Sequence, residues 1–303
     1  MKKQVFRKKK TPTSTIVATI VFLIITIICV FPIILLTVAS FTDNSELLLK
    51  GYSLFPEKYS LAAYEFLMTQ GNAIFNSIFV SIGVTLVGTI LGLSFTVALA
   101  YALSIEELPG HKALMIFVFF TMLFNGGLVP TYFMYVNYFH IKNTYAALLI
   151  PYLLVNAFNV MLVRTYFANN IPSSIIEAAR IDGAGEFRIF FKIVLPISTP
   201  ILATAGMLIG LAYWNDWYNG MLFVTKTEYF SLQSFLNKIM LDLQFLATSV
   251  SASSGEVASL VANLPSNSVR MAMAVVAILP IIIIFPFFQK YFAKGITVGS
   301  VKE

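Results

Sequence analysis

Charged residues are scarce in this sequence. Lys, Arg, Asp and Glu make up 11% of its 303 residues, whereas a typical soluble domain carries about 25%. Hydrophobic residues make up 58%, and the mean hydropathy is +0.83. A chain of this length with so few charges cannot cover its surface in water, so the composition excludes an ordinary soluble protein and indicates an integral membrane protein.

Cysteine and histidine are also nearly absent. The sequence has one cysteine, Cys29, and two histidines, His111 and His140, which stand far apart without ligand-like neighbours. A single cysteine excludes an internal disulfide and a cysteine-based zinc site. We therefore expect no metal site.

Motifs for catalysis are missing too. No Gly-x-x-x-x-Gly-Lys-Ser/Thr segment occurs, so the chain is not expected to bind and hydrolyse ATP by itself. No nucleophile and base stand in a recognisable arrangement. The sequence predicts a protein that is not an enzyme and carries no cofactor of its own.

Long apolar runs are what the sequence does contain. Runs of 18 or more apolar residues predict transmembrane helices. The first run could be read as a signal peptide, but its apolar stretch of about 25 residues exceeds the usual 7–15 of a signal core, which favours a retained helix. Six spans are predicted, at about 15–40, 74–103, 113–136, 144–166, 199–223 and 269–288.

The distribution of Lys and Arg predicts the orientation. Basic residues accumulate on the cytoplasmic side of membrane proteins. Here most of the 20 Lys and Arg fall in the N-terminal tail 1–14, the loop after the fourth span and the C-terminal tail 293–303. Both termini are therefore expected to be cytoplasmic. The first span 15–40 is followed by an extracellular loop, 41–73, and then by a core that covers 74–292.

The extracellular loop 224–268 is long enough to contain structure of its own. Apolar residues recur in it at helical spacing, which predicts a surface helix over the pore mouth. The Ser/Ala-rich stretch 247–254 that follows predicts a flexible segment. The apolar residues are Leu232, Phe235, Leu236, Ile239, Met240, Leu243 and Leu246.

The cytoplasmic loop 171–197 has the most informative pattern. Pro172 predicts a helix start, with Ser173 or Ser174 as its cap. Gly183 and Gly185 predict a sharp reversal. A second short helix is predicted over 187–194, ending before Pro196.

This loop resembles the EAA loop of binding-protein-dependent ABC importers. Glu177-Ala178-Ala179 is followed by Gly183 after three residues, then by Ile193 and Leu195-Pro196, and Asp182-Gly183-Ala184 has the form typical of sugar importers. In that family the loop fits a cleft of the ATPase subunit. The alternative for the segment 171–197 is a plain amphipathic linker between two spans. The resemblance implies these ATPase-coupling residues: Glu177, Ala178, Ala179, Asp182, Gly183, Leu195 and Pro196.

Other segments are similar to the maltose-type permease group, and to its LplC-like branch in particular. The similarity runs from about Asn72 to the C-terminus, with a family-like first helix before it. Its motifs are Leu128-Val129-Pro130-Thr131-Tyr132, Asn143-Thr144, Trp214-Asn215-Asp216-Trp217, Gln289-Lys290-Tyr291-Phe292 and Lys294-Gly295.

The resemblance implies a fold, partners and a mechanism. The fold is all-α, a type I ABC importer transmembrane domain with six transmembrane helices, in a bacterial plasma membrane. The partners are a second homologous permease, two ATPase subunits that bind ATP and Mg²⁺, and an extracellular solute-binding protein. The cargo is a sugar or oligosaccharide, moved by alternating access. Alternatives are a polyol, glycerol phosphate or modified sugar as cargo, and a passive channel, which would not need the coupling loop.

Polar residues inside the predicted spans are candidates for the sugar pathway. Tyr152, Asn156 and Asn159 stand at i, i+4 and i+7, which predicts one helix face; hydrogen bonding between helices is the alternative. The glycines Gly83, Gly88 and Gly92 predict close helix packing. Further pathway candidates are Trp214, Asn215, Asp216, Trp217, Asn125 and Tyr132. For the two tryptophans, the alternative is an aromatic belt at the membrane interface.

The segment that contacts the binding protein is predicted by position. In maltose-type permeases the loop between the last two helices reaches into the binding protein. The residues expected to do so here are Ser249, Ser251, Ser253, Ser254 and Glu256, and a passive cap over the pore is the alternative.

Overall fold

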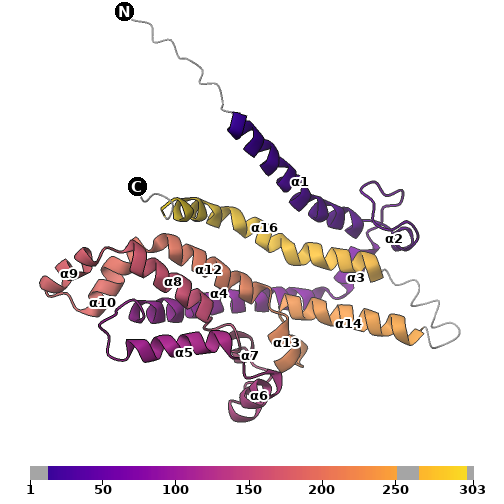
Figure 1. Ribbon diagram of the computed structural model, residues 1–303. Helices are drawn as coiled ribbons and strands as arrows, with labels where there is room; N and C mark the ends of the chain where they lie inside the picture. Colours follow the sequence, from indigo (N-terminus) through magenta and orange to yellow (C-terminus); the bar gives the residue numbers. More distant parts are fainter. Residues whose placement is uncertain (1–12, 251–265, 299–303) are drawn as a thin grey trace, which may run out of the picture. The chain divides into compact units, whose positions relative to one another are not determined.

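The computed structural model describes residues 13–250 and 266–298, and the chain divides into two compact units. The described part of the first unit comprises residues 13–69 and 266–278. The described part of the second comprises residues 70–249 and 279–298. Secondary structure in these residues is helical (Figure 1). The prediction of an all-α protein is confirmed.

The first unit begins with α1 (Thr13–Ser40), a helix of 28 residues. It contains no charged residue, and its side chains from Ser14 to Ile34 are exposed. An apolar helix that is exposed all round suits a lipid environment. At its end the Ser40 hydroxyl is hydrogen-bonded to the hydroxyl of Tyr64, 2.8 Å away. Two short helices follow, α2 (Asn44–Lys50) and α3 (Ala62–Thr69).

A buried glutamate shapes the loop between α2 and α3. The carboxylate of Glu46 accepts the backbone N–H groups of Glu57 and Lys58 at 2.9 and 2.7 Å. The hydrogen bond from Glu57 is the main cause that lowers the pKa of Glu46 below its ordinary value. Two satisfied N–H groups fix the path of a loop that has no regular structure of its own.

The second unit is built around α4 (Gly71–Ala102), a helix of 32 residues. It packs along α12 (Thr199–Trp214) and α8 (Ala157–Asn170). Glycines permit the close contact with α12: a Cβ at Gly88 would lie 2.5 Å from the ring of Tyr213, and one at Gly92 would lie 3.1 Å from Ile209. The packing predicted from the glycines is present at these two positions, whereas a Cβ at Gly83 would meet nothing within 4 Å.

The third predicted span is sharply bent, and a second bend lies just before the fifth predicted span. The third comprises α5 (His111–Leu123), α6 (Leu128–Phe133) and a π-helical turn, η1 (Met134–Tyr138), with a bend of 113° between α5 and α6. Gly127 has φ +84° at this break, a conformation that favours glycine. A second bend of 83° lies between residues 186–197 and α12.

The fourth predicted span is not a continuous helix. It consists of α7 (Ala146–Leu149), an irregular segment and α8. Pro151 interrupts the helix, and Tyr152 has φ +61°, outside the helical region. Among the described residues, three helices are long and apolar enough to cross a membrane, or up to five if each bent pair is one span. Hydropathy does not register these breaks, so six crossings stay a prediction.

The predicted helix of the loop 224–268 is present. The chain passes through α13 (Tyr218–Phe223) and a 3₁₀ turn, η3 (Thr227–Tyr229), into α14 (Leu232–Val250). The apolar face of α14 is buried at Leu232, Phe235 and Leu236 and further along. The final helix, α16 (Ser266–Val298), starts in the first unit and ends in the second.

Candidate functional site

The loop 171–197 folds as a helix, a tight turn and a second helix. The first helix is α9 (Ser173–Ile181), and the second consists of α10 (Glu186–Ile189), the π-helical turn η2 (Phe190–Val194) and α11 (Leu195–Ile197). Gly183 turns the chain with φ +78°. These elements lie together at one end of the second unit (Figure 1).

Three local predictions for this loop were wrong. Pro172 itself occupies the N-cap position, so neither Ser173 nor Ser174 caps α9 through its side chain. Gly185 has a negative φ of −73°, so only Gly183 needs the freedom of glycine. The second helix continues through Pro196, since the π-helical turn before it shifts the carbonyl that the proline ring would otherwise strike.

The loop has one buried face and one exposed face. Ile189 and Val194 are fully buried in an apolar cluster with residues of α4, α8 and α12. On the other face Ile181 and Phe187 are 86% and 83% exposed. Of the predicted coupling residues, Glu177, Ala178, Asp182, Gly183 and Pro196 are exposed, and Ala179 and Leu195 are half-buried.

The predicted pathway residues Tyr152, Asn156 and Asn159 do not share one helix face. Tyr152 lies in the irregular segment before α8. Asn156 is the N-cap of α8, where its side-chain oxygen accepts the backbone N–H of Asn159 at 3.2 Å. The break at Pro151 removed the helical register on which the prediction depended. Asn159 is buried in the first turn of α8.

The residues 214–219 connect the end of α12 to the broken fourth span. Trp214 is buried, and the side-chain amide of Asn215 donates to the carbonyl of Leu211. The carboxylate of Asp216 accepts the backbone N–H groups of Tyr218 and Asn219, both at 3.2 Å. The side-chain amide of Asn219 donates to the Pro151 carbonyl at 2.9 Å. Asp216 therefore satisfies two backbone N–H groups in the first turn of α13, and Asn219 links this turn to the interrupted helix.

Three aromatic side chains meet beside this connection and form what we call the aromatic cluster: Tyr152, Trp217 and Tyr218. The ring centroids of Tyr152 and Tyr218 are 6.0 Å apart, and those of Trp217 and Tyr218 are 5.9 Å apart, both in edge-on arrangements. The three side chains are between 37% and 44% exposed. Tyr218 was not among the predicted pathway residues, although it directly follows Trp217. Exposed aromatic faces suit the stacking of sugar rings.

Asn125 and Tyr132 make other contacts. The side chain of Asn125 accepts the backbone N–H of Gly127 at 2.8 Å, within the break between α5 and α6. Tyr132 stacks on Phe223, with ring centroids 5.8 Å apart. Asn125 therefore supports the break between α5 and α6, and Tyr132 joins α6 to α13.

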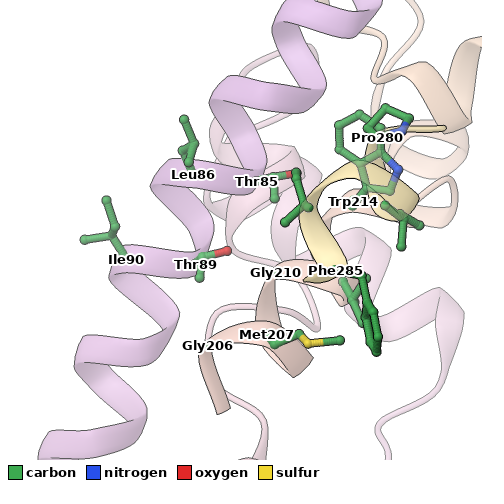
Figure 2. Close-up of a pocket in the computed structure, with 13 residues that line it drawn as sticks. Thr85, Leu86, Thr89, Ile90, Gly206, Met207, Gly210, Trp214, Pro280 and Phe285 are labelled. Atoms are coloured by element: carbon green, nitrogen blue, oxygen red, sulfur yellow. The ribbon is translucent and has the colours of Figure 1, made fainter. Parts of the chain in front are cut away.

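A pocket of about 240 Å³ lies between α4, α12 and the part of α16 in the second unit (Figure 2). Its walls are apolar apart from Thr85 and Thr89, whose buried hydroxyls have no hydrogen-bond partner in the part of the chain that the structure describes. Apolar cavities of this kind stay dry, so this pocket is poorly suited to the hydroxyls of a sugar. Of the predicted pathway residues only Trp214 lines it.

The predicted contact with a binding protein falls mostly outside the described residues. Ser249 lies in the last turn of α14. Ser251, Ser253, Ser254 and Glu256 lie outside the described ranges, as do most of the two predicted cytoplasmic tails.

Comparisons with known proteins give a consistent result. The family model for binding-protein-dependent transport system inner membrane components matches residues 110–298. The polygalacturonan/rhamnogalacturonan transport system permease protein YtcP of Bacillus subtilis (strain 168) is 37% identical over 280 residues, which cover 92% of this chain and 95% of that protein. The arabinooligosaccharides transport system permease protein AraQ of Halalkalibacterium halodurans is 30% identical, covering 98% and 99%.

A solved structure agrees with the sequence comparisons. A chain from a bacterial ABC transporter involved in the import of the acidic polysaccharide alginate is similar to this one with a TM-score of 0.74 and 29% identity, over 95% of this chain and 100% of that chain. The relatives are permease components that work with separate ATPase and binding-protein partners. The chain belongs to the binding-protein-dependent transport system inner membrane components, the non-catalytic membrane permeases of ABC importers.

Proposed function

We propose that the chain is one of two permease subunits of an ATP-driven importer for a sugar or oligosaccharide, and that it forms half of the translocation pore. The observation that carries this proposal is the two-faced loop 171–197. Its buried side chains Ile189 and Val194 join it to the core of the second unit, while its exposed side offers Glu177, Ala178 and apolar residues to a partner. An ATPase subunit that moves this loop therefore moves the core with it.

In this proposal the chain crosses the membrane six times, with both termini in the cytoplasm. The broken segment 144–170 is the fourth crossing, because irregular backbone is tolerated at membrane depth where it is buried in protein or lines a cavity. The excess of Lys and Arg in the predicted cytoplasmic segments supports this orientation.

The proposed assembly contains this chain, a second homologous permease, two ATPase subunits and an extracellular solute-binding protein. ATP and Mg²⁺ bind to the ATPase subunits. When ATP closes the ATPase pair, the two loops approach and the pore opens outward. The loop 224–268, including Ser249, Ser251, Ser253, Ser254 and Glu256, is proposed to sense the binding protein.

The sugar pathway is proposed to pass the aromatic cluster, flanked by Asn156 and Asn159. Asn125, Tyr132, Trp214, Asn215 and Asp216 are proposed as further residues of the pathway. Sugars are held by stacking on aromatic faces and by hydrogen bonds to their hydroxyls. The cluster offers three aromatic faces, and Tyr152 and Trp217 stand on irregular backbone, as expected of a segment that lines a cavity.

Truncating the aromatic cluster should weaken transport without preventing assembly. We expect Trp217→Ala and Tyr152→Ala each to lower the initial rate of uptake at subsaturating sugar about three- to tenfold, because an aromatic contact contributes on the order of 0.5–1.5 kcal/mol. Phe117→Ala is the matched control, since this aromatic side chain on α5 is 66% exposed and lies outside the cluster. Equal effects of all three variants would remove the cluster from the pathway.

An alternative cargo is a polyol, glycerol phosphate or modified sugar, and one residue favours an acidic sugar. Arg270 lies near the start of α16, and its Nε atom is buried with no hydrogen-bond partner among residues 13–250 and 266–298. A guanidinium group inside a membrane segment normally pairs with an anion or lines a pathway. The similar structure named above is that of an importer of an acidic polysaccharide.

Transport by the reconstituted complex tests the proposal. The importer would be purified through this chain, placed in proteoliposomes with its binding protein and given labelled neutral or uronic-acid oligosaccharides. We expect uptake that requires ATP hydrolysis. Uptake that continues without ATP would indicate a channel, and a preference for the uronic-acid oligosaccharides would favour the acidic cargo.

A further inference from the structure

The carboxylate of Glu186 bridges two segments that are far apart in the sequence. The hydroxyl of Tyr101 donates to Glu186 Oε2 at 2.7 Å, and Arg180 Nε donates to Glu186 Oε1 at 3.0 Å. We call these three residues the Glu186 bridge. Both carboxylate oxygens are therefore engaged, one by a hydroxyl and one by a guanidinium.

The bridge joins α4 to both helices of the loop 171–197. Tyr101 lies in the last turn of α4, Arg180 in the last turn of α9, and Glu186 is the first residue of α10. The ring of Tyr101 also packs on Phe190, with centroids 5.0 Å apart. The end of α4 is held from a third side, because Arg164 Nε of α8 donates to the carbonyl of Leu103 at 3.2 Å.

The need for such a link follows from how the two helices of the loop are held. The second helix is fixed in the core by the fully buried Ile189 and Val194. By contrast, α9 has no fully buried residue, and only half-buried side chains such as Ile176 and Ala179 pack against the core. A displacement of α9 therefore reaches the membrane helices through few contacts, and the bridge supplies polar ones with defined geometry.

The Glu186 bridge fixes the relative positions of three side chains more than it stabilises the folded state. The side chains of Arg180 and Glu186 are 40% and 49% exposed, and exposed ion pairs contribute little to the free energy of folding. The hydrogen bond from the half-buried Tyr101 is directional, and it fixes the carboxylate that receives Arg180. Removing the bridge should therefore change how the loop moves relative to α4 and leave the fold intact.

We propose that Tyr101, Arg180 and Glu186 are positioning residues that transmit the displacement of α9 to the cytoplasmic end of α4. The proposal rests on the proposed function of the loop 171–197 as the contact with the ATPase. It adds a defined route from that contact into the longest helix of the second unit. This route predicts that variants without the bridge still hydrolyse ATP but import less sugar for each ATP hydrolysed.

The test uses the complete importer with Tyr101→Phe, Glu186→Leu and the double variant. Tyr166→Phe is the matched control, since Tyr166 of α8 is also half-buried and its hydroxyl makes no hydrogen bond within the described residues. We expect Tyr101→Phe and Glu186→Leu each to lower the sugar imported per ATP hydrolysed at least about threefold, as loss of a charge-assisted hydrogen bond allows. The amount of ATPase subunit that co-purifies should be unchanged.

The double variant separates a route through Glu186 from two independent effects. If Tyr101 acts only through Glu186, the double variant should match Glu186→Leu alone. An unchanged ratio of sugar imported to ATP hydrolysed in both single variants would overturn the proposal. So would losses of this ratio that multiply in the double variant. A parallel loss of the co-purifying ATPase subunit would also overturn it. A wild-type chain that neither holds an ATPase nor imports sugar would instead overturn the proposed function.

Discussion

Replacing Gly183 with valine should lower ATP-driven uptake strongly, whereas asparagine at the same position should preserve most of it. Gly183 has φ +78° in the turn between α9 and α10. The left-handed conformation costs residues with a Cβ roughly 1–2 kcal/mol, and β-branched residues more. Asparagine tolerates this conformation. A Cβ at Gly183 would meet no atom within 4 Å, so the loss would come from the backbone and not from a clash.

Uptake into membrane vesicles and co-purification of the ATPase subunit measure this result. We expect Gly183→Val to lower uptake at least about tenfold, because α9 and α10 can no longer keep their relative direction. Glu177→Lys should also weaken ATPase binding, since it reverses a charge on the exposed side of α9. Full transport and ATPase binding in Gly183→Val would show that this turn is not part of the interface.

A second large effect is expected where α4 meets α12. A Cβ at Gly88 would lie 2.5 Å from the ring of Tyr213, closer than real Cβ atoms approach other groups. The ring has little room to move away, because its hydroxyl donates to the Leu149 carbonyl at 2.8 Å. Gly88→Ala should therefore cost on the order of 1–3 kcal/mol through overpacking, seen as a lower melting temperature and a lower yield of the purified permease.

Gly83→Ala is the matched control for this experiment. Gly83 lies in the same helix, and a Cβ there would meet nothing within 4 Å. Alanine favours a helix over glycine by about 1 kcal/mol, so this variant should be neutral or slightly more stable. If Gly88→Ala were as stable as Gly83→Ala, the close packing of α4 on α12 would be wrong.

The sequence predicted the helical class and most of the long helices because apolar composition alone decides them. The helices α1 and α4 are single apolar runs with few interruptions, so their existence followed from hydropathy. Local turn chemistry was also predictable at Gly183, since the reversal needs a residue free of Cβ strain.

Features that depend on neighbours in space were not predictable in the same way. A π-helical turn such as η2 has no clear sequence signal. Tyr152 has a left-handed backbone conformation, which tyrosine rarely adopts, so its residue type did not predict it. The Glu186 bridge joins residues 85 positions apart, so no local pattern could indicate it. The aromatic cluster likewise joins segments that are far apart in the sequence, beside the hydrogen bond from Asn219 to the Pro151 carbonyl.

The length of α4 has a consequence for where coupling takes place. At 1.5 Å per residue, its 32 residues extend about 48 Å, well beyond the roughly 30 Å of hydrocarbon in a bilayer. A helix this long either tilts or projects from the bilayer. Tyr101, in its last turn, is then carried to the level of the headgroups or past it. At that depth water and salt reach the Arg180–Glu186 pair, so the proposed transmission from α9 to α4 should weaken as the ionic strength of the cytoplasm rises.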